Sequence, residues 1–275
     1  MSAPPRTIAI TGAASGIGAA CAERLTVAGH QVIGVDRHRA PVLADLGTPE
    51  GRADAVAGVT ERCGGVLDGL VTCAGLAPLP TRPGALLASV NYFGTLALLE
   101  GLRPALGSAR APAAVAVSSN AATIQPGIST GLVQALLAGD EAGARERADR
   151  AGPVVTYAAT KLAVAHLIRR LAPGEPWAGR GIRLNAVAPG MVETPLLAEG
   201  RADPEMAALL GLLPIPLGRP GRPGEIAALI DLLLGEDGGF FCGSVVSVDG
   251  GTDALLRGPD WPAAWHPDPG DGPDA

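Results

Sequence analysis

The stretch Thr11-Gly12-Ala13-Ala14-Ser15-Gly16-Ile17-Gly18 decides the fold of this 275-residue chain. It lies between an apolar run typical of a buried strand and a segment with helical periodicity. Gly12 permits a tight turn, Gly16 lets a phosphate group approach the backbone, and Gly18 lets the helix pack closely on the sheet. The free amides at a helix N-terminus attract phosphate groups. The stretch therefore predicts a strand–turn–helix unit that cradles phosphates.

A glycine-rich turn alone is weak evidence in a chain with 39 glycines, and Asp36 adds the missing context. Asp36 closes the next apolar run, eighteen residues after Gly18 (36 − 18 = 18). A carboxylate at this place in a βαβ unit binds ribose hydroxyls. The pattern predicts NAD as the cofactor, with NADP less favoured because its 2′-phosphate would meet a like charge. Arg37 could offset part of that repulsion.

Apolar runs of strand length alternate with amphipathic segments of helix length along most of the chain. This alternation predicts βαβ crossovers and a parallel sheet with helices on both faces. The expected fold class is α/β: a single doubly wound Rossmann domain with about seven strands. Strands are expected at 7–11, 31–36, 41–46, 67–73, 113–118, 182–187 and 244–248, and helices at 16–28, 49–63, 84–106, 154–172 and 224–234, with Thr48 as the N-cap of the second helix.

The chain has one lysine, twenty arginines and two tyrosines. Lys161 follows Tyr157 by four positions, which places both side chains on one helix face. An ammonium next to a phenol favours the phenolate and lowers a pKa that is ordinarily about 10. A compact ammonium also suits a ribose hydroxyl better than a planar guanidinium does. The pair indicates acid–base chemistry; the alternative is a surface lysine beside a half-buried tyrosine.

Together these motifs resemble the short-chain dehydrogenase/reductase family, from about residue 7 to residue 251. The cradle matches the family's TGxxxGxG pattern, and Tyr157 with Lys161 matches its YxxxK pattern. The resemblance implies that Ser119 is the catalytic serine, with Ser118 as the alternative, and that Asn91 holds a water of the proton relay. The residues expected to contact the cofactor are Gly12, Ser15, Gly16, Ile17, Gly18, Asp36, Asp45, Leu46, Cys73, Ala74, Gly75, Tyr157, Lys161, Pro189, Val192 and Thr194.

Two features depart from the common pattern of that family. The family's NNAG segment is Thr72-Cys73-Ala74-Gly75 here, so a thiol replaces an amide and the support of the central strand must differ. Tyr157 also follows Ser119 by 38 residues (157 − 119 = 38), far more than is usual. Both features, with runs such as Ser89-Val90-Asn91-Tyr92-Phe93-Gly94, are similar to the subgroup of bacterial 3α-hydroxysteroid dehydrogenase/carbonyl reductases.

The resemblance implies hydride exchange between NAD and a secondary alcohol or ketone. Tyr157 would act as general acid or base, Lys161 would lower its pKa and bind the nicotinamide ribose, and Ser119 would stabilise the developing alkoxide. Apolar residues in the segment after Gly190 predict a bulky, uncharged alicyclic substrate such as a 3α-hydroxysteroid, with Arg201 as the one candidate for a carboxylate clamp. The alternatives are a reductase of a specialised metabolite and a dinucleotide-binding protein without turnover.

Residues 1–257 are expected to form one dinucleotide-binding catalytic domain, because neither a linker nor a repeat divides them. Residues 125–152 are expected to be a helical insert before Tyr157, and residues 191–216 a substrate lid; the alternative is that the lid leucines form an ordinary packed helix. The insert's apolar stripe must bury itself against the body or a second subunit. We expect it to form or restrict a homo-oligomer contact, the alternative being a solvent-facing excursion. The tail at 258–275 is predicted to be poorly ordered.

The composition excludes other classes of function. The chain is 47% apolar with a net charge of −6, and no basic face that would favour nucleic acid is visible. Its apolar runs are shorter than the roughly 20 residues of a membrane span, and no secretory leader is read. The four cysteines lack metal-ligand spacing, so no metal is expected. The sequence predicts a cytoplasmic enzyme that binds a small apolar alcohol or ketone and forms a dimer or tetramer.

Overall fold

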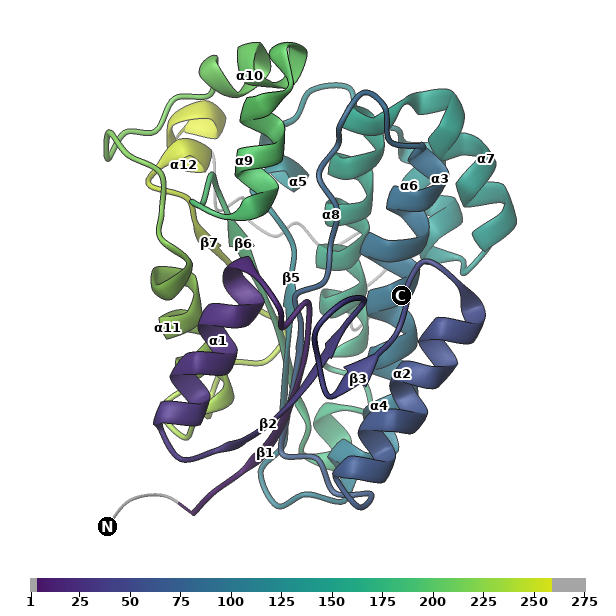
Figure 1. The fold of residues 1–275 in the computed structure, drawn as a ribbon, viewed down its shortest axis with the longest axis vertical. Coiled ribbons are helices and arrows are strands. Elements are labelled where there is room, and N and C mark those ends of the chain that lie inside the picture. The colour runs from purple at the N-terminus through teal and green to yellow at the C-terminus, as the bar shows by residue number, and fades with distance from the viewer. Residues whose placement is uncertain (1–3, 259–275) are drawn as a thin grey trace, which may run out of the picture.

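The computed structural model describes residues 4–258 of the chain. Its described part contains seven parallel strands in the order β3-β2-β1-β4-β5-β6-β7 (Figure 1). This confirms the predicted doubly wound parallel sheet, whose order reverses between β1 and β4. Of the tail predicted at 258–275, residues 259–275 lie outside the described residues. The strands are β1 (Thr7–Thr11), β2 (Gln31–Asp36), β3 (Val42–Leu43), β4 (Gly69–Thr72), β5 (Ala113–Val117), β6 (Arg183–Pro189) and β7 (Val245–Val248).

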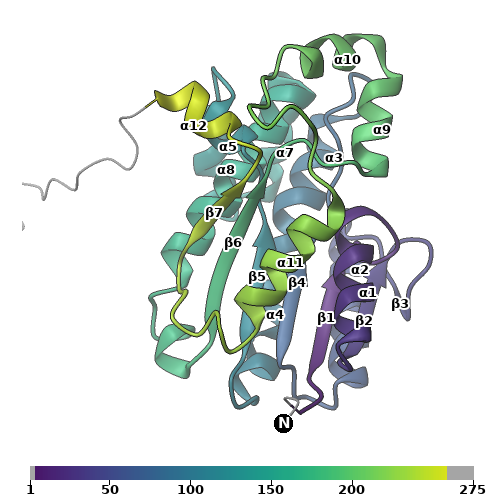
Figure 2. The ribbon, with the colours of Figure 1, turned by 90° about the vertical axis from the view of Figure 1, so that its left-hand side faces the viewer.

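Helices cover both faces of the sheet because successive side chains of each buried strand point to opposite sides. On β1, Ile8 and Ile10 join the apolar cluster on one side, while Ala9 joins the cluster on the other. Figures 1 and 2 show α1 and α11 on one face, and α2, α4 and α8 on the other. These helices are α1 (Gly16–Val27), α2 (Pro49–Arg62), α4 (Thr95–Gly107), α8 (Pro153–Leu171) and α11 (Pro223–Leu234).

The local signals at the helix ends behave as the sequence indicates. Thr48 is the N-cap of α2, and its hydroxyl accepts a hydrogen bond from the amide of Gly51 at 3.0 Å. The predicted helix at 84–106 is a run of α3 (Gly84–Ala88), η1 (Ser89–Gly94) and α4, in which η1 is a π-helical turn. Periodicity did not indicate this turn. A single π-turn widens a helix locally and often marks a functional position.

The same helical run corrects one expectation from composition. Within the described residues, the 24-residue run Gly84–Gly107 is long and apolar enough to cross a membrane. In its most apolar window, 67% is buried inside the protein, and Leu98, Leu99 and Leu102 are fully buried. Length and composition are met equally by core helices of globular proteins, and α4 packs on the sheet as such a helix (Figure 1).

The predicted insert forms two helices, α6 (Thr130–Leu137) and α7 (Glu141–Ala151). The apolar stripe of α6 is buried within its own chain, since Leu132 and Leu136 are 0% exposed. The two helices pack against α3 and α8. The insert is therefore part of the body and no solvent-facing excursion, while its effect on oligomer formation stays a prediction.

The predicted lid also forms two helices, α9 (Pro195–Ala202) and α10 (Pro204–Gly211), which lie above the carboxyl ends of the strands (Figure 2). Leu197 and Met206 are buried, whereas Leu212 is 78% exposed. Only part of the predicted apolar surface is therefore used for packing in the chain itself. The remaining described elements are α5 (Ala121–Ile124), η2 (Ala178–Arg180) and α12 (Thr252–Arg257).

Gly18 tests how the sheet and α1 are joined. A Cβ at this position would lie 2.2 Å from the carbonyl oxygen of Gly12, a backbone atom that cannot move away easily. We expect Gly18→Ala to lower the free energy of unfolding by about 1–3 kcal/mol, measured by urea denaturation. Gly224→Ala, in α11 with no atom within 4 Å of its Cβ, is the matched control and should be neutral or stabilising. Equal effects of both changes would contradict the predicted close approach.

Candidate active site

The predicted phosphate cradle lies at the point where the strand order reverses. Gly12 and Gly16 have positive φ angles of 69° and 54°, which favour glycine. A Cβ at Gly12 would lie 3.0 Å from the backbone of Ala74, and one at Gly16 would lie 3.2 Å from the methyl group of Thr194. Ser15 is the N-cap of α1, but its hydroxyl caps no amide. A backbone kept free of Cβ atoms, an exposed hydroxyl and a helix N-terminus fit the phosphates of a dinucleotide.

Asp36 lies at the end of β2, beside this cradle. Its carboxylate accepts hydrogen bonds from the backbone amides of Ala14 at 3.1 Å and of His38 at 3.2 Å. The two amides come from the cradle loop and from the residues after β2, so they fix the orientation of the carboxylate. Each oxygen has a further lone pair for a ligand. Asp36 is thus placed as predicted for ribose hydroxyls.

The segment after β4 passes next to the cradle. The Thr11 hydroxyl accepts a hydrogen bond from the Ala74 amide at 3.0 Å, which holds this segment against the end of β1. A hydrogen bond with the Cys21 thiol and burial raise the pKa of Cys73 well above its usual value, so Cys73 is a packed thiol and not a reactive one. A Cβ at Gly75 would lie 3.6 Å from the Lys161 ammonium.

Asn91 lies in the π-turn η1 and is fully buried. Its amide oxygen accepts a hydrogen bond from the Leu76 amide at 2.8 Å, and its amide nitrogen donates to the Leu76 carbonyl at 3.3 Å. The side chain therefore holds the backbone that leaves β4. The role of Asn91 in holding a relay water stays a prediction, since its amide nitrogen has a second N–H and its amide oxygen a second lone pair.

Tyr157 and Lys161 occupy successive turns of α8, and the structure brings Ser119 next to them. Burial raises the pKa of the Tyr157 phenol, and a hydrogen bond with Ser119 lowers it in part. The Ser119 hydroxyl also accepts from the Ala121 amide at 3.2 Å. The Ser118 hydroxyl, in contrast, donates to the carbonyl of Lys161 at 2.8 Å. The geometry favours Ser119 over Ser118 as the partner of Tyr157.

Lys161 is only 5% exposed, and its ammonium lies 5.8 Å from the centre of the Tyr157 ring. It donates a hydrogen bond to the Val117 carbonyl at 2.9 Å. Burial lowers the pKa of Lys161 to about 8. We expected Lys161 to lower the pKa of Tyr157; in the described structure desolvation outweighs any such effect.

The remaining residues predicted to contact the cofactor lie in two groups, one in the loop after β3 and one near the start of α9. The Asp45 carboxylate accepts from the Gly47 amide at 2.9 Å, within the loop after β3, and Leu46 is buried against the body. At the other end, Thr194 is the N-cap of α9 and its hydroxyl accepts from the Leu197 amide at 3.3 Å. Three further predicted residues line the same region: Pro189 at the end of β6, Val192 in a bridge to Gly221, and Ile17 in the first turn of α1.

One supporting contact was missed from the sequence. Asn120, next to Ser119, donates to the Asp249 carboxylate at 3.3 Å. Asp249 also accepts from the amides of Gly251 at 3.0 Å and Asp253 at 2.7 Å. Asn120 and Asp249 are 129 positions apart, which leaves no spacing signal that could have revealed the pair.

A phosphate cradle next to a buried serine, a buried lysine and a half-buried tyrosine defines a dinucleotide-dependent oxidoreductase. Residues 6–130 match the family model described as short chain dehydrogenase, and residues 142–253 match one described as enoyl-(acyl carrier protein) reductase. The chain belongs to the short-chain dehydrogenase family.

Similar proteins cover nearly the whole chain. A 3-alpha-hydroxysteroid dehydrogenase/carbonyl reductase from Comamonas testosteroni is 42% identical over 91% of this chain and 97% of its own length. A cis-4-hydroxycyclohexanecarboxylate dehydrogenase from Sinomonas cyclohexanicum is 34% identical over 91% of this chain and 97% of its own length. The crystal structure of a 3-alpha-hydroxysteroid dehydrogenase from Pseudomonas sp. B-0831, complexed with NADH, superimposes with a TM-score of 0.88 at 53% identity, and covers 91% of this chain and 98% of that chain.

The two serines should respond differently to substitution. Ser119→Ala removes the hydroxyl that bonds Tyr157, so we expect kcat for ketone reduction to fall by about 10²–10³-fold with little loss of stability. Ser118→Ala removes a buried hydrogen bond to α8, so it should cost about 1 kcal/mol of stability while kcat changes little. Steady-state kinetics and urea denaturation of both variants test this assignment. The reverse pattern would assign the catalytic role to Ser118.

The low pKa of Lys161 predicts a pH dependence of stability in the cofactor-free protein. The lysine titrates near pH 8 when folded and near its ordinary value of 10.5 when unfolded. Between these values the unfolded chain binds more protons, so this group makes stability rise with pH. The free energy of unfolding of wild type, relative to Lys161→Met, should increase from pH 7.5 to 10.5 by up to about 3 kcal/mol. Parallel pH curves of the two proteins would contradict the shift.

Proposed function

We propose that this enzyme uses NAD(H) to interconvert a secondary alcohol and a ketone on a bulky, uncharged alicyclic substrate of the 3α-hydroxysteroid class. The observation that carries the proposal is the contact of Ser119 with Tyr157, one helical turn from a buried Lys161 and next to the phosphate cradle. The hydroxysteroid dehydrogenases among the similar proteins support the substrate class.

The roles of the side chains follow from their positions. The bound nicotinamide supplies or accepts the hydride. The Tyr157 phenol donates a proton to the carbonyl oxygen during reduction and takes it back during oxidation, and the Ser119 hydroxyl donates a hydrogen bond to the same oxygen. The Lys161 ammonium binds the nicotinamide ribose. Asn91 positions the backbone between Gly75 and Leu76, which borders the site.

The preference for NAD over NADP is proposed from Asp36. Its carboxylate is held in place by two amides, so it cannot easily turn away from an incoming 2′-phosphate. Like charges at this distance repel, and the phosphate would also lose solvent. Arg37 next to it donates through Nε to His38 at 3.2 Å, and its charge could offset part of the repulsion. The NADH complex of the Pseudomonas enzyme is consistent with this choice.

The preference for an uncharged substrate is proposed from two arginines at the rim of the site. Arg82, in the loop after β4, donates to the Ala77 carbonyl at 2.6 Å and pairs with Glu199 of the lid at 3.3 Å. Arg201, the predicted candidate for a carboxylate clamp, pairs with both carboxylate oxygens of Glu193 at 3.0 Å. Both guanidinium groups are thus neutralised by lid carboxylates, which disfavours recognition of a substrate carboxylate.

The setting of the enzyme is part of the same proposal. The described cysteines are all free thiols, which suits a reducing cytoplasm. We also propose a homo-oligomer, either a dimer or a tetramer. Exposed apolar side chains, among them Phe240 and Leu255, are the kind of surface that association covers.

Initial rates on a matched set of ketones test the proposal. We expect the highest kcat/KM for a 3-keto steroid with NADH, a lower value for cyclohexanone, and the lowest for 4-oxocyclohexanecarboxylate, because the rim arginines are already paired. Replacing NADH by NADPH should lower kcat/KM by more than tenfold, and Asp36→Ala should narrow that gap.

Tyr157→Phe, prepared identically, is the control for contaminating activity and should be nearly inactive on every ketone. Preference for the carboxylated ketone would overturn the uncharged-substrate proposal and favour the activity named for the Sinomonas relative. Preference for cyclohexanone would keep the mechanism and remove the steroid assignment. Equal rates with NADH and NADPH would remove the role given to Asp36.

A further inference from the structure

Glu141, the first residue of the insert helix α7, makes a partly buried ion pair with a residue of α2. Glu141 accepts two hydrogen bonds from the Arg52 guanidinium of α2, at 2.8 and 2.5 Å. The Arg52 side chain is only 9% exposed, and its guanidinium lies over the Phe93 ring at 5.8 Å. A bidentate pair of this burial restricts both partners to one geometry.

The same carboxylate also contacts the helix that carries Asn91. Oε1 of Glu141 accepts a hydrogen bond from the hydroxyl of Ser89, the first residue of the π-turn η1, at 2.9 Å. The Arg145 guanidinium of α7 donates to that hydroxyl at 2.5 Å. Ser89 is fully buried, so its hydroxyl has these protein groups in place of water. The insert therefore holds the start of the turn in which Asn91 lies.

Arg52 also contacts the loop after β3, through the Nε–H group of its guanidinium. Its Nε donates to the Leu46 carbonyl at 2.9 Å. This loop lies against the π-turn, since a Cβ at Gly94 would be 3.1 Å from the Cβ of Leu46, and one at Gly47 would be 3.5 Å from Val90. Through Arg52 and Ser89, Glu141 thus connects the loop after β3 with the π-turn η1, which faces that loop.

We propose that Glu141 is a positioning residue for the cofactor: it fixes the loop at residues 45–47 and the turn η1 in the arrangement that binds the dinucleotide. The proposal deepens the proposed function and rests on it for the expectation that Asp45 and Leu46 contact the dinucleotide. It gives the insert a role within one protomer. Neither Glu141 nor Arg52 touches the reacting atoms.

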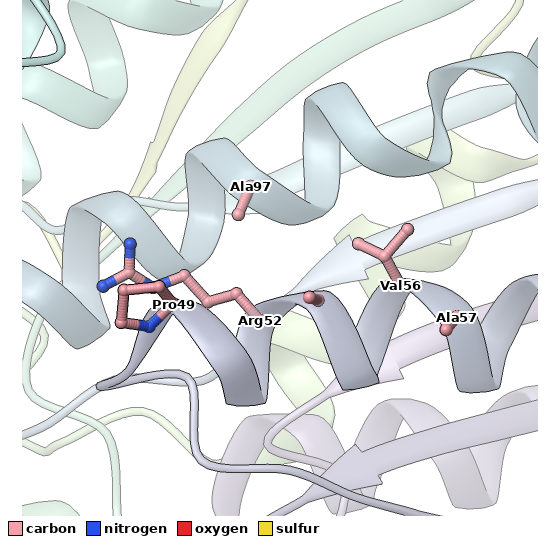
Figure 3. Close-up of a pocket in the computed structure, with 6 residues that line it drawn as sticks. Pro49, Arg52, Val56, Ala57 and Ala97 are labelled. Atoms are coloured by element: carbon pink, nitrogen blue, oxygen red, sulfur yellow. The ribbon is translucent and has the colours of Figure 1, made fainter.

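The charges explain why the carboxylate matters. A guanidinium buried without its counter-charge is strongly unfavourable, so Arg52 must move toward water if Glu141 loses its charge. A groove between α2 and α4 has a volume of about 490 Å³ and offers Arg52 a path toward water. Figure 3 shows residues that line it: Pro49, Arg52, Val56, Ala57 and Ala97. Movement into that groove would release the Leu46 carbonyl. Arg52 also lowers the pKa of Glu141, which keeps the carboxylate ionised near neutral pH.

Glu141→Gln tests the proposal because it removes the charge and keeps the size. We expect the Kd of NADH, measured by fluorescence titration, to rise about tenfold, while kcat at saturating NADH stays within about twofold. Hydrogen exchange in the cofactor-free protein should be faster at residues 45–48 and 89–95. Arg52→Lys keeps the positive charge but cannot serve Leu46 and Glu141 together, so it should change both readouts in the same direction.

Glu146→Gln is the matched control, since Glu146 lies on the same helix in an exposed pair with Arg150. It should leave the NADH affinity and the exchange rates unchanged. A lower melting temperature of Glu141→Gln with unchanged NADH affinity would overturn the proposal, because Glu141 would then contribute to stability alone. If wild type bound no NADH, the proposed function would fail, whereas the exchange rates at 45–48 and 89–95 would still report whether Glu141 holds the two segments together.

Discussion

The close approach of α1 to the carbonyl oxygen of Gly12 is the constraint on which the cofactor side of the molecule depends. A Cβ at position 18 would lie 2.2 Å from this oxygen, so only glycine allows α1 to begin directly above the end of β1. The same turn leaves room for the backbone at Ala74 and for the Thr11 hydroxyl to bond its amide. Three separate chain segments can therefore meet at one point, and the N-terminus of α1 faces the place where the strand order reverses.

Burial sets the electrostatics of the catalytic side. Lys161 is surrounded by protein and donates to the Val117 carbonyl, so its charged form is less well stabilised than in water. Tyr157 is affected by the same desolvation, which raises the pKa of its phenol. A ribose with its hydroxyl acceptors would supply the ammonium with further hydrogen bonds. The site is therefore arranged for a ligand that completes the solvation of a buried charge.

The helical layer supplies the rigidity behind these groups. The π-turn directs the Asn91 side chain to the Leu76 backbone, and the insert fills the space beside that turn with buried residues such as Leu132 and Ala148. Ser89 and Arg52 then join the insert to two segments that lie far apart in the sequence. In this arrangement an insertion near an active site acts through its contacts with the catalytic framework.

Short-range information in the sequence was enough to predict the sheet, the cradle, the position of Asp36 and the pairing of Tyr157 with Lys161. The reason is that spacing along one strand or helix decides which side chains share a face. The sequence favoured Ser119 over Ser118 only through the family resemblance, since the two serines differ in what lies opposite each of them. It also gave no sign of the π-turn, or of the pairs Arg52–Glu141 and Asn120–Asp249, whose members are 89 and 129 residues apart. Tertiary structure alone decided these, because a hydrogen bond between distant segments depends on how whole helices and strands pack, and no local spacing records that packing.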